Sequence, residues 1–468
     1  MGSQPFSNPQ ISNPFFSLLL EQKEFFSSGA TLSKTFRLQA IEKLKQALKV
    51  RETQLLQALN EDLGKSFFEG YETELGMVYT EIALVEKYLG RWMKSKRTPV
   101  PLTHFPAQSK IQPEPYGTAL VLSPWNYPLQ LCLIPLVSAL AAGCCVILKP
   151  APEAAACQKE LVSLIQDTFP QKLAAVVTGG IPESQHLLAL DFDKIFFTGS
   201  PRVGKLVMRA AAEYLTPITL ELGGKSPCII TKQANLPLAA RRIAWGKWLN
   251  CGQTCVAPDY LLVEESVQKP LIHFLKQEIQ RQYGVEPLKN PDYPHLINSF
   301  HFHRQLDLMK GNDIFFGGQF CSQKNSLAPT LLFPKNTEAP VMQEEIFGPL
   351  LPIIPYRTPQ QLISFLQQRP KPLALYLFTQ NKKERDMLFS RLSFGGGCWN
   401  DTVLHLASPF LPFGGVGNSG MGHYHGKAGF EAFSHSKSLL LRGSKTDLPV
   451  RYPPYSPEKG KLLRFFLK

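Results

Sequence analysis

The sequence predicts an α/β protein of two or three domains. Its 468 residues exceed what one ordinary hydrophobic core covers. From residue 118 onward, short apolar runs alternate with helical stretches, and turn or capping residues close each run. Hydrophobic residues make up 44% of the chain and charged residues 19%, which is typical of globular proteins. Alternation at this spacing predicts a parallel sheet with helices on both faces.

Helices are expected near the N-terminal end. Leucine and isoleucine recur at helical spacing over residues 38–48 and 55–63, and Gly64 provides a stop. We interpret these helices as structural.

The segment 115–148 contains no charged residue and is longer than a membrane span requires. However, "SPWNYP", Pro135 and Gly143 interrupt it. It therefore divides into a strand at 118–122, a short helix and a strand at 144–148. We predict a buried β-α-β unit rather than a transmembrane helix.

Further apolar runs, "LAAVV", "KIFF" and "PCII", continue the sheet pattern, and a second α/β region extends from about Gly223 into the 420s. The segment 91–115 is basic and proline-rich, and the tail after Phe433 is irregular. Both could be arms that pack outside the two main domains.

Charge and cysteine content limit the function classes. The net charge of +13 includes no basic run of five or more, so it fits solubility and an anionic cofactor better than nucleic-acid binding. Nine cysteines, mostly in apolar runs, do not make a disulfide scaffold. The N-terminal "MGSQPFSNPQ" lacks the basic and apolar regions of a signal peptide. We expect reduced thiols and a cytoplasmic location.

The stretch "FFTGSPRVGK", residues 196–205, leads a strand into Gly199 and opens a helix at Gly204. Free backbone N–H groups at a helix N-terminus attract phosphate. The stretch is not a P-loop, because Leu206 stands where Ser or Thr would hold magnesium, and no GxGxxG is present. Taken alone, it fits either a dinucleotide site or a plain tight turn.

A glutamate, Glu221, and a cysteine, Cys255, are candidate catalytic residues. In "LELGGKSP", Glu221 stands between two leucines before a double-glycine turn, and desolvation there would raise its pKa toward that of a general base. A surface glutamate beside a loop is the alternative.

In "NCGQTCVAPDY", Cys255 follows Cys251 by four residues. No histidine occurs between His186 and His273, so we expect no metal, and the compartment disfavours a disulfide. A buried thiol and a nucleophile remain open for Cys255.

Together these stretches resemble the aldehyde dehydrogenase superfamily. The motifs "SPWNYP", "LKP", "FTGSPRVG", "ELGGKSP", "GQTCVAP", "EEIFGP" and "LPFGGVGNSGMG" follow the family's order, and the resemblance covers roughly residues 15–456. The separation between Glu221 and Cys255 also resembles the family spacing. Within the family, "YHGKAGFEAFSH" and "RYPP" resemble the class 3 branch, which includes fatty and aromatic aldehyde dehydrogenases.

The resemblance implies NAD(P)-dependent oxidation of an aldehyde to its carboxylic acid. Cys255 would attack the aldehyde carbon as a thiolate, and the side-chain amide of Asn126 with the Cys255 backbone N–H would stabilise the oxyanion. After hydride transfer, Glu221 would activate water to hydrolyse the thioester. Branches that pass the acyl group to coenzyme A lack this glutamate.

The resemblance also implies binding residues. Those for the cofactor are Lys149, Gly199, Ser200, Val203, Gly204, Glu345 and Phe347. The glycine turn would lie beside the pyrophosphate, Lys149 and Glu345 would bind ribose hydroxyls, and Phe347 would pack against the nicotinamide end. Tyr127 and Asn400 fall where class 3 members line the aldehyde pocket.

One departure concerns the cofactor. The family often has "KPSE", whose glutamate contacts the adenosine ribose, whereas this chain has "KPAPE" with Pro152 at that position and Glu153 one residue later. A carboxylate facing the 2′ position would repel a 2′-phosphate, so its loss leaves NADP use open. We predict activity with both NAD and NADP.

The implied fold has a Rossmann-like cofactor domain at residues 1–93 and 116–222 and an α/β catalytic domain at 223–431. Arms at 94–115 and 432–468 would bridge the subunits of a homodimer. The tail "EKGKLLRFFLK" interleaves basic and apolar residues and is too short to span a membrane. Weak membrane-surface contact and packing on a partner subunit are the alternatives for it.

Two other functions stay open. A thioesterase could use Cys255 and Glu221 without a cofactor, although the Gly199 turn argues against it. A non-catalytic protein on the same fold would not need Cys255, Glu221 and Asn126 together.

Overall fold

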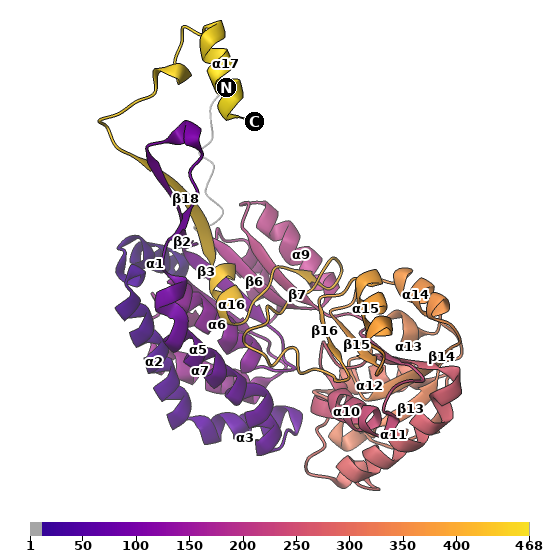
Figure 1. Cartoon of the computed structure of the whole chain (residues 1–468). Helices are drawn as coiled ribbons and strands as arrows, with labels where there is room; N and C mark the ends of the chain where they lie inside the picture. Colours follow the sequence, from indigo (N-terminus) through magenta and orange to yellow (C-terminus); the bar gives the residue numbers. More distant parts are fainter. Residues whose placement is uncertain (1–11, 468) are drawn as a thin grey trace, which may run out of the picture.

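The computed structural model describes residues 12–467. It contains two α/β units, each built on its own sheet, and a β-ribbon that projects from them (Figure 1). The α/β class predicted from the alternating apolar runs is confirmed. The segment 1–10, on which the expected lack of a signal peptide rests, and Lys468 of the basic tail lie outside the described residues.

The first sheet has the strand order β17-β7-β6-β3-β4-β5. Its strands are β3 (Thr118–Ser123), β4 (Cys145–Pro150), β5 (Ala174–Val176), β6 (Lys194–Gly199), β7 (Ile218–Leu222) and β17 (Gly420–Met421). All run parallel except β17, which is antiparallel to β7. The chain moves outward from β3 to β5 and then returns to β6 on the other side of β3. The carboxyl ends of β3 and β6 therefore flank a topological switch point, where α/β proteins bind ligands.

Helices cover both faces of this sheet (Figure 1). They are α1 (Phe16–Ser27), α2 (Lys34–Val50), α3 (Glu52–Leu63), α4 (Phe67–Gly70), α5 (Gly76–Trp92), α6 (Gln130–Ala142), α7 (Ala155–Thr168), α8 (Ile181–Leu188), α9 (Pro201–Ala212) and α16 (Gly426–Ala432). Alternate side chains of β3 enter different cores: Leu120 packs in the cluster that includes α1, α8 and α9, whereas Val121 packs in the cluster that includes α2, α5 and α6.

The charge-free segment 115–148 forms β3, the fully buried helix α6 and β4, as predicted. In the described part of the chain, no helix has the length and apolarity that crossing a membrane requires.

The second sheet has the order β10-β13-β14-β9-β8-β15-β16 and is parallel except for β10. Its strands are β8 (Pro227–Ile230), β9 (Tyr260–Glu264), β10 (Asp313–Phe316), β13 (Thr330–Phe333), β14 (Leu350–Tyr356), β15 (Ala374–Phe378) and β16 (Gly396–Trp399). Helices α10 (Leu236–Trp248), α11 (Gln268–Tyr283), α12 (Ser299–Met309), α13 (Pro340–Gln343), α14 (Pro359–Gln367) and α15 (Lys382–Arg391) belong to this unit, as does the short pair β11 (Phe320–Cys321) and β12 (Ser326–Leu327).

The projecting ribbon consists of β1 (Lys96–Thr98), β2 (Ala107–Pro115) and β18 (Ser434–Arg442), all antiparallel. Helix α17 (Pro457–Phe466) lies at its far end (Figure 1). The division into three parts with the boundaries given above stays a prediction. Within the predicted catalytic segment 223–431, however, β17 pairs with β7 and α16 contacts α6, so this part of the chain returns to the first unit.

Candidate active site

Cys255 is reachable from a cavity. It lies in the loop after α10, where the backbone of Asn250 and Cys251 has positive φ. Six of the other cysteines are buried, but Cys255 is half-buried and lines a cavity of about 970 Å³. Cys251 is a separate buried thiol, with its Sγ 3.5 Å from the Tyr293 hydroxyl oxygen. The disulfide and buried-thiol alternatives therefore do not describe Cys255.

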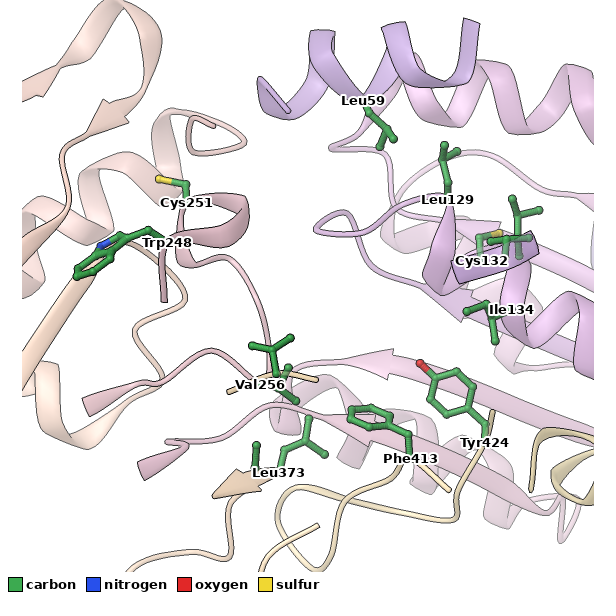
Figure 2. Packing of buried hydrophobic residues seen from close by; sticks show 14 of the residues in the cluster. Leu59, Leu129, Cys132, Ile134, Trp248, Cys251, Val256, Leu373, Phe413 and Tyr424 are labelled. Atoms are coloured by element: carbon green, nitrogen blue, oxygen red, sulfur yellow. The ribbon is translucent and has the colours of Figure 1, made fainter. Parts of the chain in front are cut away.

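The residue that follows Cys255 anchors this loop. Val256 is fully buried and belongs to the hydrophobic core cluster that includes Leu373, Phe413 and Tyr424 (Figure 2). Phe413 and Tyr424 also line the cavity. Because Val256 points into packed core, the neighbouring Cys255 side chain is held toward the cavity.

Glu221 stands at the carboxyl end of β7 and lines the same cavity. Only 3% of the residue is exposed, and neither carboxylate oxygen has a hydrogen-bond partner. Burial without a partner raises the pKa of this carboxyl well above its usual range. The surface-glutamate alternative is thus wrong.

Asn126 follows β3 and also lines this cavity. Its side-chain Nδ2 donates to the backbone oxygen of Gln253 at 2.9 Å. An amide nitrogen carries two hydrogens, so one donor of Asn126 remains for another acceptor. The structure thus brings Cys255, Glu221 and Asn126, which are far apart in the sequence, to one cavity.

The charges of the cavity oppose ionisation of the thiol. Burial raises the pKa of Cys255, and the carboxylates of Glu345 and then Glu221 raise it further. Burial also raises the pKa of Glu345 to about 8, with a further contribution from the charge of Asp259. In this form the site therefore holds a neutral thiol beside two carboxyl groups.

A second cavity, of about 990 Å³, lies at the carboxyl ends of β3 and β6. The predicted cofactor residues that line it are Lys149, Gly199, Ser200 and Val203. Ser123 and Thr198 line it too, and their buried hydroxyls lack hydrogen-bond partners. The lining residues common to both cavities are Pro124, Trp125, Thr198, Gly199, Ser200 and Arg202. The two cavities thus form adjoining parts of one groove with unused polar groups, which suits a dinucleotide.

The turn at residues 199–204 exposes the N-terminus of α9 to the second cavity and lets α9 pack closely on β7. Ser200 caps α9, accepting a hydrogen bond from the Val203 N–H at 3.4 Å, so the free N-terminus of a twelve-residue helix borders the second cavity. Gly204 does not line either cavity. A Cβ on Gly204 would come within 2.8 Å of Leu222, so this glycine permits close packing of α9 on β7.

The remaining predicted cofactor residues lie on both sides of the groove. Lys149 donates from Nζ to the Gly179 carbonyl at 2.6 Å, and burial lowers its pKa. The Glu345 carboxylate lies against Gly223, where any Cβ would collide with it. Phe347 has positive φ and meets Trp125 edge-to-face, with ring centroids 5.4 Å apart.

Tyr127 and Asn400 do not line either of these cavities. The Tyr127 ring is buried beneath Lys65, with Nζ 3.9 Å from the ring centroid, and its hydroxyl lies 2.6 Å from that of Thr254. Asn400 uses its side-chain amide on the backbone of Thr379. Their assignment to the aldehyde pocket, which the resemblance implies, stays a prediction.

The loop 343–349 is held by residues that were not predicted from the sequence. Lys225 forms an ion pair with Asp259 and donates to the Glu344 carbonyl, while Asp259 accepts the Ile346 N–H at 2.9 Å. Arg304 donates to the Ile346 carbonyl at 2.7 Å. Lys225 and Asp259 stand inside the quoted motifs "ELGGKSP" and "NCGQTCVAPDY". Their opposite charges are the one feature of the sequence that could have predicted an ion pair between these motifs.

Comparison with known proteins identifies the family. Residues 21–439 match the model of the aldehyde dehydrogenase family. The chain belongs to this family. It is an oxidoreductase that acts on aldehydes, and the predicted resemblance is confirmed.

Individual aldehyde dehydrogenases match almost end to end. The 4,4'-diaponeurosporen-aldehyde dehydrogenase of Staphylococcus aureus is 45% identical over 450 residues, covering 96% of this chain and 98% of the relative. The dimeric NADP-preferring aldehyde dehydrogenase of Rattus norvegicus is 44% identical, covering 93% and 97%. A solved structure of Staphylococcus aureus AldH in a substrate-bound state superposes with a TM-score of 0.95 at 44% identity, covering 97% and 100%.

Proposed function

We propose that this aldehyde dehydrogenase works through a covalent intermediate on Cys255, with NAD or NADP as the hydride acceptor. The observation that carries the proposal is the meeting of Cys255, Glu221 and Asn126 in one cavity, whose lining continues into the groove beside Gly199. A thioesterase without a cofactor would not need that groove.

The first step forms a bond between the Cys255 sulfur and the aldehyde carbon. The thiol proton goes to the ionised carboxylate of Glu345, the charged neighbour that most raises the pKa of the thiol. The carbonyl oxygen becomes an oxyanion, which accepts hydrogen bonds from the unused Asn126 N–H and the Cys255 backbone N–H. One such donor is typically worth about 3–4 kcal/mol in the transition state.

The groove residues would hold the dinucleotide. Ser200 and the N-terminus of α9 would bind the pyrophosphate, and Lys149 would bind a ribose. Phe347 would pack against the nicotinamide end. When bound, the nicotinamide supplies the acceptor for the hydride that leaves the aldehyde carbon. The unpartnered hydroxyls of Ser123 and Thr198 support this assignment, because buried polar groups rarely go without a hydrogen bond.

Glu221 completes the reaction. Its carboxylate takes a proton from water as the water oxygen bonds to the acyl carbon. The carbon–sulfur bond then breaks, the acid is released, and the proton held by Glu221 passes to the sulfur to return the Cys255 thiol. The absence of competing partners for the Glu221 oxygens supports this role, because both remain free to orient a water molecule.

We also propose that the chain acts as a homodimer, as the name of the Rattus norvegicus relative describes that protein. The arms at 94–115 and 432–468 would supply the contact, with weak membrane-surface contact by the tail as the alternative. For location we keep the cytoplasm as a proposal.

The test uses the purified full chain, NAD or NADP, and a panel of short, long, aromatic and polyene aldehydes. We expect aldehyde-dependent growth of reduced-cofactor absorbance with both cofactors. Cys255→Ala should abolish turnover while cofactor binding, followed by protein fluorescence, persists. Unchanged turnover by Cys255→Ala would remove the proposed nucleophile.

A further inference from the structure

A closed hydrogen-bond network lies behind the Asn126 amide, on the side away from the cavity. At its centre, Lys65 Nζ and Glu74 Oε1 form an ion pair of 2.6 Å, and both side chains are completely buried. Lys65 follows α3, and Glu74 lies in the turn of wide helix at Tyr71–Leu75 that joins α4 to α5. Neither residue lines either cavity.

This ion pair forms hydrogen bonds with the backbone on both sides of Tyr127. Lys65 Nζ donates to the Asn126 carbonyl at 3.2 Å. The second oxygen of Glu74 accepts the backbone N–H of Leu129 at 2.8 Å and of Gln130 at 3.1 Å, which are unpaired donors at the start of α6. The pair thus fixes the segment that presents the Asn126 side chain.

The network continues to the loop that carries the nucleophile. Asn250 Nδ2 donates to the Asn126 carbonyl at 2.7 Å and to the Gln253 carbonyl at 3.2 Å. The Asn126 Nδ2 donates to that same Gln253 carbonyl. In turn, the Asn250 backbone N–H donates to the buried Glu69 carboxylate at 2.8 Å. Both lone pairs of the Asn126 carbonyl are therefore occupied, and its peptide plane cannot rotate without breaking two bonds.

We propose that Lys65 and Glu74 are positioning residues for the Asn126 amide, an inference that rests on the oxyanion role proposed above. Oxyanion stabilisation needs a donor that is already oriented when charge develops, because reorientation would consume the benefit. A buried ion pair is a poor source of net stability, since well-packed apolar residues of similar volume serve as well or better. An apolar pair could not form the hydrogen bonds that Lys65 and Glu74 make with the backbone of Asn126 and of the start of α6.

The experiment compares first-turnover rates of reduced-cofactor formation by rapid mixing. Glu74→Gln keeps the side-chain shape but removes the charge that holds Lys65. The double variant Lys65→Met/Glu74→Met removes the donor without leaving an unpaired buried charge. Both should lower the first-turnover rate by about 10-fold or more, approaching the loss of about 100-fold seen when an oxyanion donor is removed. Cofactor affinity should stay unchanged.

Glu81→Gln provides the matched control. Glu81 lies on α5, is 1% exposed, accepts the Gly426 backbone N–H at 2.8 Å and lines neither cavity. Its replacement should lower the thermal unfolding temperature as Glu74→Gln does, but leave the first-turnover rate of the folded enzyme unchanged. A purely structural role for Glu74 would make the two variants behave alike.

A double-mutant cycle decides whether the effect passes through Asn126. In an Asn126→Ala background, Glu74→Gln should cause no further loss of rate. Equal losses in both backgrounds, or folded Glu74→Gln and Lys65→Met/Glu74→Met enzymes with wild-type rates, would overturn the inference. If Asn126→Ala itself retains the wild-type rate, the oxyanion role fails instead, so the two failures are distinguishable.

Discussion

Glu221 and Glu345 beside Cys255, and Glu74 behind Asn126, have different surroundings, and these determine what each carboxylate can do. Glu221 is buried with both oxygens free, so it can accept a proton from water. Glu345 lies against the double-glycine turn, where the Gly224 backbone N–H partly offsets the effect of burial on its pKa. Glu74 uses both oxygens on protein donors and is left with a positional role.

The first prediction at this scale concerns Glu221→Gln. The variant should retain the first turnover but lose steady-state rate by about 100-fold to 10,000-fold, the usual contribution of a general base. Only the carboxylate form acts as base, and burial raises the Glu221 pKa, so the wild-type hydrolysis rate should go on climbing with pH beyond the range in which an ordinary glutamate titrates. The variant should show a flat profile. Burst amplitudes and steady-state rates across pH provide the measurement, and parallel profiles would contradict the assignment.

The second prediction concerns Glu153, which is exposed but lines the cavity with Lys149 and Arg202. Its carboxylate would repel a 2′-phosphate there, and solvent screening limits the effect to about 1 kcal/mol, or about five-fold. Glu153→Gln should therefore raise kcat/KM for NADP by that factor and leave kcat/KM for NAD nearly unchanged. Steady-state assays with both cofactors test this; an equal change for both would place the carboxylate away from the 2′ position.

At the scale of elements, apolar patterning predicted β3, β4, β5 and β6 of the first sheet and the helices α2, α3 and α6, but not β7 or β17. The charge-free run forms β3, α6 and β4, and every residue of these three elements is buried. The lack of charged residues in the sequence therefore corresponds directly to burial in the fold. Motif order also located Cys255, Glu221 and Asn126. The Lys65–Glu74 pair escaped prediction, because a separation of nine residues across the end of one helix and the start of another matches neither helical nor strand spacing. The assignment of Tyr127 to the aldehyde pocket stays a prediction; its ring lies beneath Lys65 and lines neither of the two cavities described above.

Helix α9 supports a prediction of its own. Gly204→Ala would place a methyl group 2.8 Å from Leu222, so either the Leu222 side chain or the helix must shift. Because Leu222 is buried, we expect the helix to shift away from β7 and to move its N-terminus in the groove. We expect a rise in cofactor KM of about 10-fold, equivalent to about 1.4 kcal/mol, with little change in kcat at saturation. Met208→Ala, on the exposed face of the same helix, is the control. Wild-type cofactor KM in Gly204→Ala would show that the contact is relaxed by Leu222 alone.

At the scale of the whole molecule, the catalytic groove and the projecting ribbon are separate features. Exposed apolar residues such as Ile181 and Leu206 line the groove, and the ribbon exposes further large apolar residues that line neither cavity. On β18 these are Leu440, 52% exposed, and Leu441, 47% exposed, and Leu102 and Phe105 lie on the connection between β1 and β2. Apolar residues gathered on a projecting arm mark a protein or membrane contact.

The last prediction tests the homodimer. If β18 packs on a partner subunit, Leu440→Glu/Leu441→Glu would bury charge in the contact and convert the dimer to monomer, because an unpaired buried charge is strongly unfavourable. Ser436→Glu, which adds a charge at an exposed position on the same strand, should leave the dimer intact. Analytical ultracentrifugation gives the mass, and first-turnover rates report the catalytic groove, which these residues do not line. A dimer that survives the leucine replacements would assign the subunit contact to another surface. Binding of the wild-type protein, but not of the leucine variant, to anionic vesicles would favour the membrane alternative.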